Sequence, residues 1–204
     1  MSSRLATTGG FRRAAVTGVL LFWGFALVAG AIAPGYSLRD DYTSSLAGRG
    51  SEVALLGVAA LAVLGLAHLA AAAVVRSAAV PLAVAGAFGL LTAAFRTSCP
   101  AGAAGCGSGA NDAPPDLADA VHGLAVAGYE IALLVAMGCV AVGTLRGGGP
   151  KWLGAVSLLA AIASVLLVLQ LGGADTGWWQ RAWLVVNTGW LVLVVVLSRD
   201  DAST

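Results

Sequence analysis

Six long runs of apolar residues, separated by short polar segments, dominate the chain. They cover approximately residues 14–33, 53–75, 80–95, 117–145, 153–171 and 183–197. A helix needs about 20 apolar residues to cross the hydrocarbon core of a bilayer. The runs show little helical periodicity, as expected where lipid covers the outer faces. The pattern predicts an all-α integral membrane bundle of six transmembrane helices that forms one domain over residues 1–204.

Composition strengthens this prediction. Hydrophobic residues make up 59% of the chain and charged residues 10%, whereas a soluble domain carries about 25% charged residues. So few charges could not cover the surface of a water-soluble protein of 204 residues. The formal net charge of +1 gives no indication of a nucleic-acid partner, so membrane lipid is the expected surrounding.

The first apolar run could be mistaken for a cleaved signal peptide. Residues 31–33 (Ala-Ile-Ala) resemble a signal-peptidase site. Pro34 follows directly, and proline is a poor residue at that position. We therefore expect this run to remain in the protein as the first membrane helix.

Basic residues predict how the bundle is oriented, because cytoplasmic loops carry an excess of Lys and Arg. One side holds Arg4, Arg12, Arg13, Arg76, Arg146, Lys151 and Arg199. The other side holds Arg39, Arg49, Arg96 and Arg181. The count of seven against four predicts a plasma-membrane protein with both termini in the cytoplasm. Trp178 and Trp179 would then lie at the outer interface.

The fourth run carries the densest set of ionisable residues. Asp119, His122 and Glu130 share one helical face within about 80°, and Glu130 lies about 16 Å deeper than Asp119. Ionisable groups at membrane depth are candidates for function. The stripe should therefore point into the bundle, where these three residues are candidate acid–base groups. The structural alternative is that they only bond one another or nearby polar groups.

Other polar residues could join this stripe at the outer end of the bundle. The candidate substrate-binding residues are Asp41, Ser44, Ser45, Arg96, Arg181 and Asn187. Carboxylate–arginine pairs there would satisfy both charges. The alternative is an interfacial ring of salt bridges that fixes the helix ends. A serine beside His122 could imitate a catalytic triad, but nothing in the sequence supports that reading further.

The remaining candidate ligands do not indicate a metal or a cofactor. His68 lies toward the opposite side from His122, so a site with several histidines is not expected. His68 is instead expected to make a hydrogen bond between helices. Cys99 and Cys106 share a loop and could form a disulfide in an oxidising compartment, or remain two thiols, while Cys139 is expected to pack.

Three segments resemble the DUF998 membrane family. They are residues 36–46 (YSLRDDYTSSL), residues 95–97 together with 116–122 (FRT and DLADAVH), and residues 177–181 (GWWQR) followed by Trp190 and Arg199. The resemblance implies a six-helix fold in which Asp41, Ser44 or Ser45, His122 and Arg181 matter. It supplies no reaction, and the Cys99–Cys106 loop is not part of it.

Four functions remain open from the sequence. The favoured one is binding or handling of a lipid or another amphipathic small molecule in an outward-facing polar pocket. The second is a membrane-embedded enzyme that uses His122 and Asp119 as acid and base. The third is a small transporter or channel with Glu130 as a relay, and the fourth is a non-catalytic subunit of a membrane complex.

Overall fold

Six helices form the structure, a computed structural model that describes residues 2–100, 116–148 and 150–198. The helices are α1 (Ser2–Ile32), α2 (Ala54–Ala72), α3 (Ala79–Ala94), α4 (Leu117–Gly143), α5 (Lys151–Val168) and α6 (Thr176–Leu197). All six are long and apolar enough, with their flanking turns, to cross a membrane. The described part of the chain contains no strand. The predicted all-α membrane bundle is therefore confirmed.

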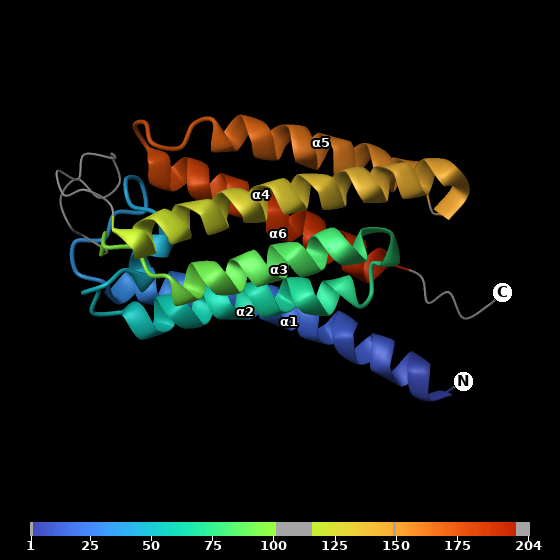
Figure 1. The fold of residues 1–204 in the computed structure, drawn as a ribbon, viewed down its shortest axis with the longest axis horizontal. Helices are drawn as coiled ribbons and strands as arrows, with labels where there is room; N and C mark the ends of the chain where they lie inside the picture. Colours follow the sequence, from blue (N-terminus) through green and yellow to red (C-terminus); the bar gives the residue numbers. More distant parts are fainter. Residues whose placement is uncertain (1, 101–115, 149, 199–204) are drawn as a thin grey trace.

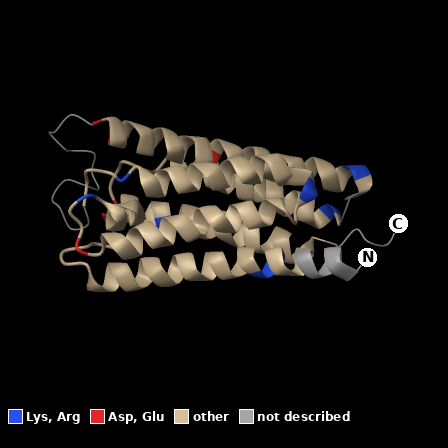
Figure 2. Ribbon diagram, turned by 60° about the horizontal axis from the view of Figure 1, so that its bottom comes forward, with Lys and Arg blue, Asp and Glu red and all other residues tan. Residues whose placement is uncertain are grey.

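The helices run side by side in chain order, and α6 returns to contact α1 (Figure 1). An even number of passes brings the start of α1 and the end of α6 to the same end of the bundle. Charged residues lie mainly at the two ends, and the ribbons between them are almost free of charge (Figure 2). The core is closely packed around fully buried residues such as Phe22, Leu82, Met137 and Leu191.

Two helices are longer than the apolar runs predict. Helix α6 begins at Thr176 rather than near residue 183, so Gln180 and Arg181 lie within its first two turns. Helix α1 extends back to Ser2. The polar residues in these extensions lower the local hydropathy without interrupting the helix, which explains why hydropathy placed both starts too late.

The connection between α1 and α2 folds back onto the bundle. Its central part is a 3-10 helix, η1 (Thr43–Ala47), which packs against α2, α1 and α6. The η1 backbone lies directly on Gly57 of α2, where an added Cβ would be 2.3 Å from the Ala47 nitrogen. Leu46 is 1% exposed, so this segment closes part of the end of the bundle opposite the termini. We call this the η1 end.

Candidate functional site

A buried polar layer lies in the middle of the bundle, around Glu130 of α4. Ser164 of α5 donates a hydrogen bond to Glu130 Oε1 at 2.8 Å, and the Trp183 indole of α6 donates to Oε2 at 3.0 Å. Asn187 joins the layer through Ser164, to which its Nδ2 donates at 3.0 Å. Glu130 is 8% exposed. The predicted inward orientation of Glu130 is confirmed, and both of its oxygens have partners.

A second buried pair lies next to this layer. His68 of α2 donates from Nδ1 to the Leu64 carbonyl at 2.8 Å, which leaves Nε2 of the neutral ring as an acceptor. The Tyr129 hydroxyl of α4 bonds that Nε2 at 3.2 Å. The Tyr129 and Trp183 rings meet edge to face at 5.9 Å. The predicted interhelical hydrogen bond of His68 is confirmed, although His68 accepts it rather than donating it.

His122 lies nearer the η1 end and turns inward as predicted. Its Nδ1 donates to the Phe95 carbonyl, at the end of α3, at 2.8 Å. From the sequence we expected His122 to approach a carboxylate or a hydroxyl group. That expectation was wrong, because the end of α3 leaves a carbonyl without a helical partner at this point. The bond holds the ring so that Nε2 remains available as an acceptor.

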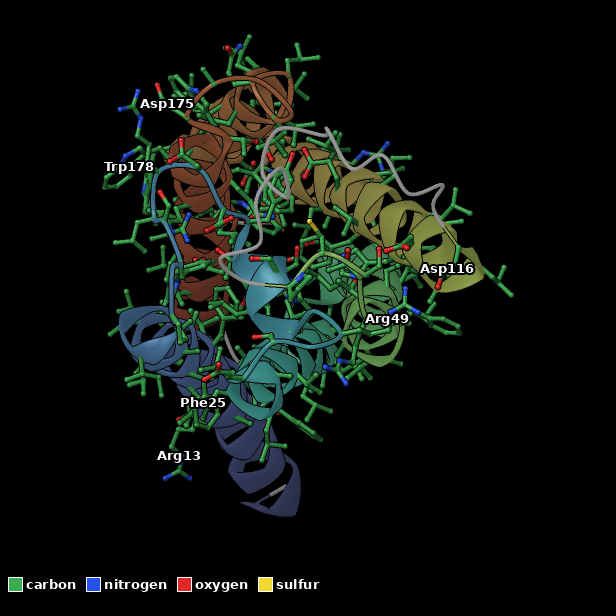
Figure 3. All side chains as sticks on the ribbon, turned by 90° about the vertical axis from the view of Figure 1, so that its left-hand side faces the viewer. Arg13, Phe25, Arg49, Asp116, Asp175 and Trp178 are labelled. Atoms are coloured by element: carbon green, nitrogen blue, oxygen red, sulfur yellow. The ribbon has the colours of Figure 1, made fainter. Side chains whose placement is uncertain are left out.

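Asp119 serves the structure of the loops rather than pairing with His122. Together with Asp116 it forms the capping box that begins α4, and its Oδ1 accepts from the Ser98 N–H at 2.7 Å. Arg49 pairs with Asp116 at 2.6 Å and with Asp119 at 3.4 Å. The Arg49 pair and the backbone hydrogen bond lower the pKa of the Asp116 carboxyl. In Figure 3, which views the η1 end, Arg49 and Asp116 lie close together at the rim.

Arg96 and Arg181 do not pair with carboxylates as predicted. Arg96 donates to the Ala47 and Gly48 carbonyls at 2.7 and 2.8 Å. The carbonyls of Ala47 and Gly48 are free to accept these bonds, because a 3-10 helix as short as η1 leaves most of its carbonyls without internal partners. The arginines therefore hold η1 and its flanking loop in place.

Arg181 makes the larger of these two networks. It donates to the carbonyls of Leu38, Asp41 and Gly177 at 2.7 to 3.0 Å, and to the Tyr36 hydroxyl. The Asp41 carboxylate instead accepts from the Ser37 N–H at 2.7 Å. Burial raises the pKa of the Tyr36 phenol, although the nearby Arg181 cation opposes that shift. The Asp41–Arg181 contact is thus made through the backbone of Asp41.

A cleft opens at the η1 end, between η1, α4 and the facing ends of α5 and α6. Its volume is about 340 Å³, and its described lining includes Ser44, Ser45, Thr97, His122 and Gln180. The Ser45 hydroxyl is engaged with the Tyr42 carbonyl at 2.7 Å. Among the described lining residues there is no Asp, Glu, Lys or Arg. We call this space the outer cleft.

A smaller inner chamber of about 50 Å³ adjoins the outer cleft. The two spaces share Ser44, Val126 and Gln180 in their linings. The chamber is mainly apolar, and the Tyr129 and Trp183 rings form part of its wall. Because these rings bond His68 and Glu130, the wall of the chamber is fixed by the buried polar layer.

The candidate residues therefore fall into three groups. Ser44, Ser45 and His122 line the outer cleft; Glu130 and Asn187 lie behind the chamber wall; and Asp41, Arg96, Asp119 and Arg181 brace the loops. Sequence reasoning missed Gln180, Ser164, Tyr129 and Trp183. The positions of Ser164 and Asn187 at membrane depth were a signal for the polar layer. Gln180 was marked only as part of the 177–181 segment, and its place in the cleft followed only from the true start of α6.

Two further predictions concern ligands and thiols. Within the described ranges, no group of three or more His, Cys, Asp or Glu side chains could hold a metal ion. Cys106 lies outside the described residues, so the Cys99–Cys106 disulfide stays a prediction. Cys139 is a free thiol on α4, half-buried on the side of the bundle.

The fold and the polar layer define a multi-pass integral membrane protein of six helices. A family model described as "Protein of unknown function (DUF998)" matches residues 16–197, and the chain belongs to that family. The searches of curated proteins and of solved structures found no match. The resemblance seen in the sequence is thus confirmed.

Proposed function

We propose that this protein binds an amphipathic small molecule, with its polar headgroup in the outer cleft and an apolar end directed toward the inner chamber. The observation that carries this proposal is that the two spaces adjoin and share Ser44, Val126 and Gln180 in their walls. A volume of about 340 Å³ lies within the usual range for ligand sites, about 300–1,000 Å³. The polar mouth and apolar chamber match the two ends of such a molecule.

The chemistry of the cleft favours a neutral headgroup rich in hydroxyl groups. Its described polar groups are hydroxyls, an amide and an imidazole, which donate and accept hydrogen bonds without carrying a fixed charge. Arg96 and Arg181, which would have favoured an anion, bind backbone carbonyls instead. A glycolipid or a similar polyol lipid is the class of ligand that fits.

Blocking the junction of the two spaces should abolish binding. Val126→Trp is expected to lower retention of a monoglucosyl diacylglycerol at least about tenfold, because the indole would fill the passage that the apolar end must enter. Native mass spectrometry of the detergent-solubilised protein with the added glycolipid measures this retention.

Val185→Trp is the matched control, since Val185 is 57% exposed on the outer face of α6. It should retain the glycolipid as the unaltered protein does. Equal retention by the Val126→Trp variant, or no retention by the unaltered protein, would contradict the proposal.

The same proposal places the cleft outside the plasma membrane. The described ionisable groups at the end opposite η1 are all basic, among them Arg13, Arg76, Arg146 and Lys151. This charge distribution supports cytoplasmic termini.

Sidedness can be tested in a variant in which the three native cysteines are replaced. A single cysteine introduced at Gly109 should react with an impermeant thiol reagent added to intact cells, and one at Gly148 should react only after lysis. Reaction of the Gly148→Cys variant in intact cells would reverse the proposed orientation.

One observation favours an enzyme as the second candidate function. His122 presents Nε2 while Nδ1 is fixed by the Phe95 carbonyl, and Ser44 lines the same cleft. This arrangement would allow His122 to act as a general base on a bound hydroxyl group. Glycolipid that is retained unchanged by mass would favour binding alone, whereas a product that disappears in His122→Gln would favour catalysis.

A further inference from the structure

An apolar groove runs along the outer surface of the bundle between α3 and α4. In the middle of the bundle it contains a hollow of about 430 Å³, lined only by apolar residues that include Val84, Phe88 and Ile131. Gly128 allows the groove to be deep here, because an added Cβ would lie 2.6 Å from the Phe88 ring. The hollow lies within the membrane-spanning part of both helices.

The groove continues toward the end of the bundle opposite η1. A second hollow of about 450 Å³ shares Val135 with the first and is also lined by Gly138, Cys139, Ser77 and Arg146. The groove is therefore apolar along most of its length and polar at one end only. We call the two hollows together the α3–α4 groove.

The dimensions of the second hollow match one leaflet of a bilayer. From Val135 to Arg146 the helix rises about 16 Å at 1.5 Å per residue, and half of a ~30 Å hydrocarbon core is about 15 Å. An acyl chain that starts at the level of Arg146 would reach the middle of the membrane near Val135. The first hollow would accept any further length of chain.

Charge distinguishes the headgroup that fits. Arg146 is exposed and makes no hydrogen bond or ion pair to a described residue. Arg76, next to Ser77, and Lys151, a few residues after Arg146, add positive charge to the same end. No described acidic side chain lies at this end to neutralise them. Basic residues at a membrane surface attract anionic lipids.

We propose that the α3–α4 groove is a binding site for an anionic phospholipid, with the phosphate at Arg146 and Ser77 and one acyl chain along Val135 and Gly138. This site is separate from the outer cleft. It lies at the other end and on the outer surface of the bundle, and it selects for negative charge where the outer cleft offers none.

Filling the groove provides the sharpest test. An added Cβ at Gly138 meets nothing within 4 Å, so Gly138→Leu should fold normally while occupying the space of the chain. We expect it to lower retention of phosphatidylglycerol at least fivefold, measured by native mass spectrometry against phosphatidylcholine with the same chains. Gly189→Leu is the matched control, because Gly189 is exposed on α6 and also has open space around it.

A second variant tests the headgroup. Arg146→Gln should weaken phosphatidylglycerol binding about fivefold, the effect of one basic residue near a membrane surface, and leave the weak phosphatidylcholine binding unchanged. Val126→Trp should alter neither, which separates this site from the outer cleft.

Equal retention of the two phospholipids by the unaltered protein would overturn the proposal, as would phosphatidylglycerol retention that Gly138→Leu leaves unchanged. A dimer in native mass spectra that Gly138→Leu dissociates would also overturn it, because the groove would then be a contact between two copies of the chain.

Discussion

Replacing Glu130 by alanine should destabilise the folded bundle by about 3 kcal/mol. The change leaves the buried Trp183 N–H without its acceptor, and such an unpaired group costs about 1–3 kcal/mol. The Ser164 hydroxyl keeps Asn187 Oδ1 as its remaining acceptor, at 3.2 Å. The change also opens a void between α4, α5 and α6, which adds to the loss. The free energy of unfolding, measured by titration with a denaturing detergent, checks this value.

Glu130→Gln separates structure from function at the same position. The glutamine oxygen can accept from Trp183 and its amide can donate to Ser164, so stability should fall by less than about 1 kcal/mol. Glu52→Ala, at an exposed position, should change stability by less than about 0.5 kcal/mol. If Glu130→Gln is as unstable as Glu130→Ala, the polar layer needs the ionisable group. If the Glu130→Gln variant is stable but has lost the activity of the protein, the carboxyl group of Glu130 has a functional role, such as the relay of a transporter or channel.

The second large effect is expected at Gly57. Gly57→Ala would place a Cβ 2.3 Å from the Ala47 nitrogen and 2.4 Å from the Leu46 carbonyl carbon, and backbone atoms cannot move aside without undocking η1. We expect a loss of at least about 2 kcal/mol in the free energy of unfolding, at the upper part of the usual overpacking range. Glycolipid retention should fall with it, since η1 lines the outer cleft.

Gly24→Ala is the control for this substitution. Gly24 also lies in a membrane helix, but an added Cβ meets nothing within 4 Å. Alanine there should leave the bundle as stable or slightly more stable, by up to about 1 kcal/mol. Similar losses for both variants would mean that helix effects, rather than the η1 contact, decide the outcome.

The sequence contained enough information for the helices and for the orientation of α4. Six apolar runs of membrane length have few other stable forms. The angular positions of Asp119, His122 and Glu130 predicted one inward face, because an ionisable stripe toward lipid is costly. Helix geometry and the lipid around the bundle are enough to determine this orientation, whatever the rest of the fold.

The connections could not be predicted in the same way. Thr43–Ala47 has no hydrophobic period that marks a buried helix, and its burial depends on Gly57 and Gln180, which are distant in sequence. Arg96 and Arg181 were expected to pair with carboxylates, because such a pair satisfies both charges. Arg181 instead donates hydrogen bonds to the Leu38 and Asp41 carbonyls. The positions of these carbonyls depend on how the loop folds, which the sequence pattern does not reveal.

The contacts that hold η1 also determine the order in which parts of the cleft can form during biosynthesis. The Thr43 N–H bonds the Gln180 side chain at 2.5 Å, across 137 residues of chain. At synthesis rates of about 5–20 residues per second, roughly 7–27 s separate the emergence of these two residues from the ribosome. The segment between α1 and α2 can therefore dock on α2 early, but its bond to Gln180 forms only after five helices have been made. The cleft acquires its final shape only when the last helix enters the membrane.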